Sequence, residues 1–166
     1  IWAATIILAE VPSGALSDLI GRKRLLVLTS SLMVMEMAVW AFAPRSDPTL
    51  LFWLMAINRI LSGLGEAAAS GSDEALVYES LENGGMKQQW SGVLETVARW
   101  QAVAFMIAMV IGGVVYDPGL MGSVAQFLGF ESEVTKEDTL RIPIILTLLT
   151  AILCWFNCLG LVETKA

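Results

Sequence analysis

The sequence predicts an all-α polytopic membrane protein with five transmembrane helices, and three observations support this. Hydrophobic residues make up 56% of the 166 residues and charged residues only 16%, whereas charged residues form about a quarter of a soluble domain. The hydrophobic residues are collected in blocks of about 20, the length at which a helix spans roughly 30 Å of hydrocarbon. Isolated strands cannot satisfy their backbone hydrogen bonds in lipid, so each block is expected to be a helix.

Five such blocks follow one another along the chain. They cover about residues 1–19, 25–43, 49–70, 90–116 and 140–162. The third block could continue as an amphipathic helix to about residue 82, where Asn83-Gly84-Gly85 would stop it. The longest connection, residues 117–139, is expected to be a solvated loop, in which GLMGSVAQFLGF could form a short interfacial helix.

The composition excludes several kinds of chemistry. The chain contains no histidine, which rules out histidine zinc sites, a Ser-His-Asp triad and a histidine pH switch. Cys154 and Cys158 lie four residues apart in the last block, and we expect buried free thiols because no other ligand lies near them in the sequence. We therefore expect no enzyme activity, no metal or other cofactor, and no nucleic-acid partner.

The distribution of basic residues predicts the orientation in the membrane. One side would carry Arg22, Lys23, Arg24, Lys87 and Lys165, and the other side Arg45, Lys136 and Arg141. Basic residues in short loops mark the cytoplasmic side, so residues 20–24 are predicted to be cytoplasmic. The first residue lies within an apolar block that lacks the basic region of a signal peptide, and we expect a fragment that begins within a helix.

The turn between the first two blocks, GALSDLIGRKR, places glycines and an aspartate at fixed offsets before its basic residues. Gly14 would let a neighbouring helix approach closely, and Gly21 would take a backbone conformation that turns the chain. The basic residues 22–24 would meet lipid headgroups, and Asp18 could accept hydrogen bonds from Arg22 or from backbone N–H groups. A topology anchor requires only the basic run, so the glycines and the aspartate indicate a further role.

This turn resembles the signature loop of the major facilitator superfamily, G-x-L-a-D-r-x-G-R-k-x, which joins the second and third transmembrane helices on the cytoplasmic face. The matching residues are Gly14, Asp18, Gly21, Arg22 and Lys23, and Arg24 is also basic. Leu19 stands where the family usually has Arg or Lys, and EVPSG upstream resembles the lead-in of many bacterial members. The resemblance implies that these residues belong to a cytoplasmic latch that holds one state of a transporter.

A second motif, in the third block, supports the resemblance. RILSGLGEAA, residues 59–68, resembles the fourth-helix motif R-x-x-q-G-x-g-x-a, with Ser62 in place of Gln. GSDEAL, residues 71–76, resembles the cytoplasmic end of that helix, and by resemblance Asp73 or Glu74 would join the latch. The blocks are similar to helices two to six, so we expect a partial N-terminal bundle, residues 1–166, without the first helix and the C-terminal bundle. The Gly-Pro pair of antiporters does not occur in the fourth block.

Ionisable residues within the blocks need a partner or a function, because a charge at bilayer depth costs a few kcal/mol or more. Arg59, Ser62 and Glu66 fall on one face of the third block. Two interpretations stay open, namely a cavity-facing site for substrate or proton and a structural salt bridge between helices. The resemblance implies that this helix lines the central cavity and that its arginine takes part in proton coupling in some antiporters.

Further charged positions are candidates for the same site. Glu95 and Arg99 are spaced i, i+4 in the favourable order, which predicts an intrahelical pair, but Arg99 could instead pair with Glu66. Glu10 lies just before a proline that kinks the helix, and it could titrate with a proton. The resemblance places the helix of Glu36 at the periphery, which argues against contact of Glu36 with a substrate.

The resemblance implies a secondary active transporter of small solutes that works by alternating access and is coupled to protons, with drug or metabolite efflux as one form. The alternative is a non-transporting membrane receptor or scaffold that retains the fold. The expected partners are a small-molecule substrate, a proton as coupling ion, membrane lipids and the C-terminal bundle. The expected location is a bacterial inner (plasma) membrane.

Overall fold

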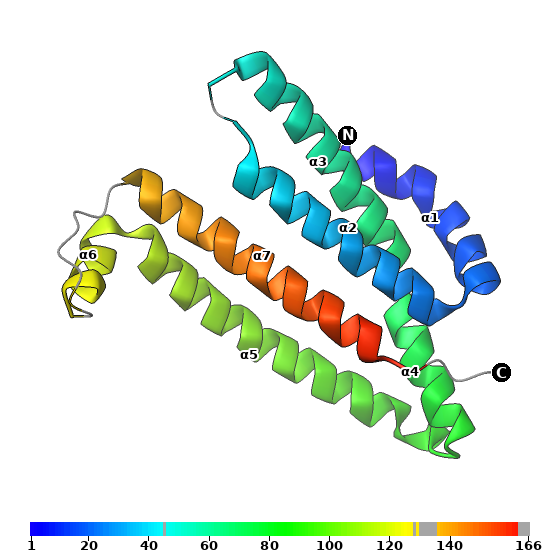
Figure 1. Cartoon of the computed structure of the whole chain (residues 1–166). Helices are drawn as coiled ribbons and strands as arrows, with labels where there is room; N and C mark the ends of the chain where they lie inside the picture. Colours follow the sequence, from blue (N-terminus) through cyan, green and yellow to red (C-terminus); the bar gives the residue numbers. More distant parts are fainter. Residues whose placement is uncertain (45, 128, 130–135, 163–166) are drawn as a thin grey trace. The chain divides into compact units, whose positions relative to one another are not determined.

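A computed structural model describes the chain apart from residues 45, 128, 130–135 and 163–166 (Figure 1). Regular structure in the described residues is entirely helical. The elements are α1 (Trp2–Ile20), α2 (Arg22–Phe42), α3 (Pro48–Ala69), α4 (Ser72–Asn83), the short 3₁₀ helix η1 (Lys87–Gln89), α5 (Trp90–Tyr116), α6 (Pro118–Phe127) and α7 (Lys136–Gly160). Within these residues, five helical stretches are long and apolar enough to cross a membrane. This confirms an all-α, multi-pass integral membrane protein.

The helix ends differ from the predicted blocks where the turns have their own structure. α2 begins at Arg22, because the basic residues of the turn form its first turn. The third block breaks at Gly71, which has a left-handed backbone (φ 72°), so the predicted extension is the separate helix α4. Residues 118–127 form α6, so most of the stretch GLMGSVAQFLGF is helical, which was the alternative to a loop in this connection. Arg45 and Lys165, which entered the topology prediction, lie outside the described residues.

The chain divides into two compact units, residues 1–87 with 148–166, and residues 88–147. In the first unit α3 packs against both α1 and α2, and α2 also contacts α4, as Figure 1 shows. The start of α3 is fixed locally by Asp47, whose side chain accepts hydrogen bonds from the backbone of Thr49 (2.9 Å) and Leu50 (3.2 Å). Pro48 then occupies the first helical position, where a missing N–H costs nothing.

Small residues on α3 allow its neighbours to approach. Gly63 is the tightest point, because a Cβ at this position would lie 2.7 Å from Cβ of Thr5 and 2.9 Å from the backbone oxygen of Trp2, both on α1. Further along the same pair of helices, Oγ of Ser13 donates to the backbone oxygen of Ala67 at 2.8 Å. Close backbone approach and hydroxyl-to-carbonyl hydrogen bonds are the usual means by which helices associate in lipid.

The second unit contains α5, α6 and the first part of α7. α5 is exposed along almost its whole length, and Val115 is its buried residue. In a soluble protein such an apolar helix would be unstable, but in a bilayer the same surface is solvated by lipid tails. The first unit therefore holds most of the packed interior.

Candidate functional site

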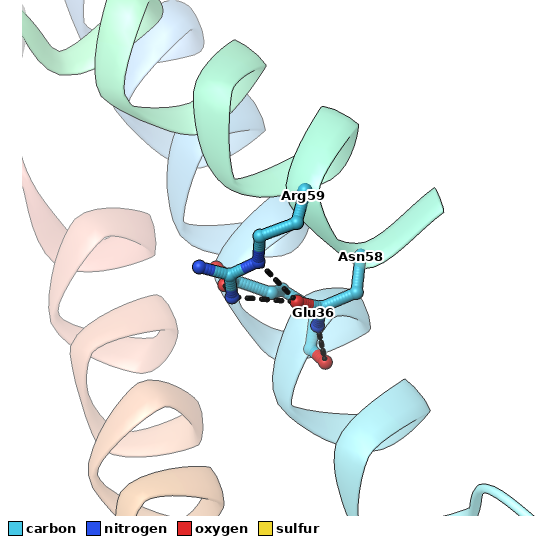
Figure 2. A network of polar contacts seen from close by, with 3 residues as sticks. All are labelled: Glu36, Asn58 and Arg59. Carbon is cyan, nitrogen blue, oxygen red and sulfur yellow. Dashed lines mark hydrogen bonds and ion pairs between the residues drawn. The ribbon is translucent and has the colours of Figure 1, made fainter. Parts of the chain in front are cut away.

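A cluster of three polar residues joins α2 to α3 in the middle of the apolar helices (Figure 2). Nη2 of Arg59 lies 3.1 Å from Oε1 of Glu36. Nδ2 of Asn58 donates to the backbone oxygen of Glu36 at 2.9 Å. Oδ1 of Asn58 accepts from Nε of Arg59 at 3.1 Å and from Nη2 at 2.6 Å. Asn58 therefore connects the backbone of α2 to the guanidinium group of Arg59.

The three residues differ sharply in exposure. Asn58 is fully buried, with 0% of its surface exposed, and the side chain of Glu36 is 11% exposed, whereas that of Arg59 is 45% exposed. A charged side chain in the apolar interior needs a counter-charge and hydrogen bonds. The Glu36 carboxylate receives both from Arg59 on α3, and the guanidinium group still reaches the surface of the unit.

The packing of α2 on α3 brings this cluster together. Asn58 and Gly65 are seven residues apart and therefore lie on one face of α3. Both are buried, and the Cβ position of Gly65 lies 3.9 Å from Cβ of Leu32, one turn before Glu36 on α2. Because the two helices meet along this face, the side chain of Asn58 points at α2. The guanidinium group of the next residue, Arg59, is thereby placed beside α2.

The face predicted to unite Arg59, Ser62 and Glu66 does not form a contact among the described residues. Arg59 pairs with Glu36 on the neighbouring helix, while Glu66 is exposed and Ser62 is half-buried, with no ion pair or side-chain hydrogen bond to Arg59. The structure thus contains an interhelical salt bridge at Arg59. It also reveals Glu36 and Asn58 as its partners, which the spacing along α3 did not identify.

The predicted latch turn contains one ion pair to another helix. Gly21 has a positive φ of 91°, as expected for the residue that turns the chain between α1 and α2. Nη2 of Arg22 lies 2.9 Å from Oε1 of Glu79 on α4, with both side chains about one-third exposed (28% and 35%). Asp18 is exposed and makes no ion pair among the described residues, so Arg22 is held by α4 and not by its own turn.

The other predicted latch residues do not join the Arg22 pair. Lys23 is half-buried and Arg24 exposed on the first turn of α2. Gly14 is exposed, and a Cβ there would meet nothing within 4 Å, so the expected close helix approach occurs at Gly63 instead. Asp73 and Glu74 stand in the first turn of α4, where acidic residues stabilise a helix end.

The remaining coupling candidates stand apart from the Glu36 cluster. Nη2 of Arg99 lies 2.7 Å from Oε1 of Glu95, which confirms the intrahelical pair, and both side chains are 71% exposed. Glu10 is exposed, and its backbone oxygen accepts from Oγ of Ser13 at 2.9 Å. Its carboxylate has no partner among the residues described, so the structure leaves a titrating role for Glu10 as a prediction.

The two cysteines and the acidic residues were the possible metal ligands of this chain. Cys154 and Cys158 are free, as predicted, but Cys154 is exposed and Cys158 half-buried, so the expectation of full burial was wrong. They lie on α7, where the apolar surface faces outward and is available to lipid. No group of three or more Cys, Asp or Glu residues suited to a metal ion occurs in the part of the chain described.

Comparisons of this chain with protein-family models, with curated proteins and with solved structures give no match. The major facilitator resemblance therefore depends on the two sequence motifs alone.

Proposed function

We propose that this chain is part of a secondary active transporter of small solutes, in which the Glu36–Asn58–Arg59 cluster is the coupling site. The observation that carries the proposal is a charged, hydrogen-bonded cluster between two membrane-spanning helices. Ionisable residues at this depth are expensive and usually mark the path of a substrate or ion. A cluster that only joined two helices would not need a guanidinium group that is nearly half exposed.

The coupling ion in this proposal is a proton, and Glu36 is the group that exchanges it. A carboxylate can exchange a proton, and Oε1 of Glu36 lies 3.1 Å from Nη2 of Arg59. Loss of the Glu36 charge would remove the ion pair between α2 and α3, while Nη2 of Arg59 stays hydrogen-bonded to Oδ1 of Asn58. Such a local change of charge can favour one of two global conformations, as alternating access requires.

The latch is proposed to act at the other end of α2. The Arg22–Glu79 ion pair fastens α4 to the first turn of α2, and Asp18, Lys23 and Arg24 remain available for a further partner. By resemblance that partner would be the C-terminal bundle of the same protein. Breaking the latch should shift the population of states without abolishing substrate binding, because the cluster at Glu36 is untouched.

Proton movement in proteoliposomes tests the proposal directly. Liposomes that contain the full-length transporter, including its C-terminal bundle, and an internal pH-sensitive dye are exposed in turn to small carboxylates, amines, sugars and neutral aromatic compounds. At least one class should cause solute-dependent proton movement, and Glu36→Gln and Arg59→Lys should abolish it. Arg141→Lys and Glu82→Gln are the matched controls, because these residues lie outside both the cluster and the latch.

The alternative outcome is equally clear. If no solute class moves protons, and if a solute gradient also drives no flux, the transporter proposal fails and a receptor or scaffold with this fold is favoured. If proton movement persists unchanged in both Glu36→Gln and Arg59→Lys, transport stands but the cluster is not its coupling site. The bacterial inner membrane is the proposed location, and localisation of the protein in fractionated cells checks it.

A further inference from the structure

The guanidinium group of Arg59 has one edge that the cluster uses only in part. Nε and Nη2 both donate to Oδ1 of Asn58, so the edge formed by these two nitrogens is occupied. On the other edge, Nη2 makes a single contact of 3.1 Å with Glu36, and Nη1 has no partner among the described residues. Figure 2 shows Nη1 directed away from Asn58. One donor of Nη1 and one donor of Nη2 shared with Glu36 therefore lie on this edge.

Asn58 fixes the direction of that edge. Its Nδ2 donates to the backbone oxygen of Glu36 at 2.9 Å, so a flipped amide would place Oδ1 against that oxygen and Nδ2 against the guanidinium donors of Arg59. Its Oδ1 therefore always faces Arg59 and holds the guanidinium plane. A donor group that is held in place before the ligand arrives loses little entropy on binding, and this pre-organisation increases affinity.

We propose that this Nη1–Nη2 edge binds the carboxylate group of an anionic small molecule, which makes the transported solute a carboxylate. The inference rests on the proposed function and adds the substrate class to it. A guanidinium edge presents two parallel N–H donors that match the two oxygens of a carboxylate. The Arg59 side chain is 45% exposed, which lets a solute reach it, whereas Glu36 at 11% is shielded. An amine would be repelled by the cation, and a sugar hydroxyl would gain only a neutral hydrogen bond.

Glu36 and the solute compete for the same nitrogen. Glu36 reaches Nη2 through one oxygen only, so its hold on Arg59 is weaker than a two-point carboxylate contact. Its negative charge also repels the incoming carboxylate. Removal of that charge should therefore strengthen binding by about tenfold, because like charges at close range repel each other in a shielded site. If Glu36 had only a structural role, removal of its charge would weaken carboxylate binding, since the cluster would become less ordered.

Chemical modification of arginine measures binding without knowledge of the natural solute. Phenylglyoxal reacts with accessible guanidinium groups, and peptide mass analysis gives the rate at Arg59 and, as an internal reference, at the exposed Arg141. The probes are sodium formate and sodium benzoate, and their controls are methylammonium chloride and benzyl alcohol. At a probe concentration about ten times its Kd, modification of Arg59 should slow about tenfold while that of Arg141 is unchanged.

The variants decide the interpretation. Glu36→Gln should lower the formate concentration needed for half-protection by about tenfold, and Asn58→Ala should raise it, while Glu82→Gln should leave it unchanged. Equal protection by methylammonium, or no protection by either carboxylate in the wild-type protein and in Glu36→Gln, overturns the carboxylate site. Protection without any proton movement in proteoliposomes keeps the site and overturns transport. Proton movement with amines or sugars, without protection by carboxylates, keeps transport and overturns the carboxylate site.

Discussion

Two glycines on α3 provide a matched test of how closely the helices of the first unit approach. Gly63 faces α1 and Gly65 faces α2, and both are buried. A Cβ at Gly63 would lie 2.7 Å from Cβ of Thr5, whereas a Cβ at Gly65 would lie 3.9 Å from Cβ of Leu32. Carbon atoms in good contact are about 3.5–4.0 Å apart, so the first substitution overlaps its neighbour by about 1 Å and the second fits.

The energies follow from this difference. Replacing Gly by Ala within a helix stabilises the helix by about 1 kcal/mol, and this gain applies to both positions. Overpacking costs typically about 1–3 kcal/mol, and the upper part of that range applies at Gly63 because a backbone oxygen of α1 lies only 2.9 Å from the new Cβ. We expect Gly63→Ala to destabilise the protein by about 1–2 kcal/mol and Gly65→Ala to stabilise it by up to about 1 kcal/mol.

Unfolding in mixed micelles measures both variants under the same conditions. Helix contacts are lost as the fraction of sodium dodecyl sulfate rises, and tryptophan fluorescence reports the transition, because Trp2 lies beside Gly63. The Gly63→Ala transition should move to a lower detergent fraction and the Gly65→Ala transition to an equal or higher one. If both variants unfold at the wild-type midpoint, α1 does not approach α3 as closely as described, and the reasoning is refuted.

Three other predictions concern the cluster, the latch and the break after α3. Asn58→Ala should destabilise the protein by about 1–3 kcal/mol, because it removes a buried hydrogen bond between α2 and α3 and leaves part of a guanidinium unpaired. Asn157→Ala, at an exposed position, should cost less than about 0.5 kcal/mol in the same unfolding titration. Glu79→Gln should change the free energy of unfolding by less than about 1 kcal/mol, since its ion pair with Arg22 is partly exposed. It should also speed the modification of Arg22 by phenylglyoxal, and an unchanged rate would contradict the ion pair. Gly71→Ala should destabilise α4 by about 1 kcal/mol or more, because a φ of 72° strains a residue with a side chain. Circular dichroism measures the helix content, and an unchanged helix content in the variant would argue against this backbone conformation.

The sequence allowed the membrane helices to be predicted because their length and polarity are local properties. The block at residues 90–116 coincides with α5, since nothing but its own apolar composition decides where it starts and ends. The break at Gly71 was harder to predict. Glycine is tolerated within helices, and its left-handed backbone depends on how α4 packs against α2.

The site was only partly predictable for a related reason. Arg59 stood out because a lone cation in an apolar block must find a partner. Glu66 shares its helix face, but residues seven apart are separated by about 10 Å along the axis, too far for a direct ion pair between most rotamers. The actual partner, Glu36, is set by the register of α2 on α3, which no spacing within one helix encodes. The same holds for Arg22, whose partner on α4 is Glu79.

The exposed surface of α5 has a consequence for the thickness of the surrounding bilayer. The Glu95–Arg99 pair is the last charge on this helix before its uncharged stretch from Trp100 to Tyr116, which extends for about 25 Å. A hydrocarbon core is about 30 Å thick, so a thick membrane would draw the ion pair below the headgroups unless the lipid thins locally. With both side chains 71% exposed, nothing in its own unit shields the pair from that change. The pair therefore fixes how deep α5 sits in the membrane, and it ties the helix to membranes of matching thickness.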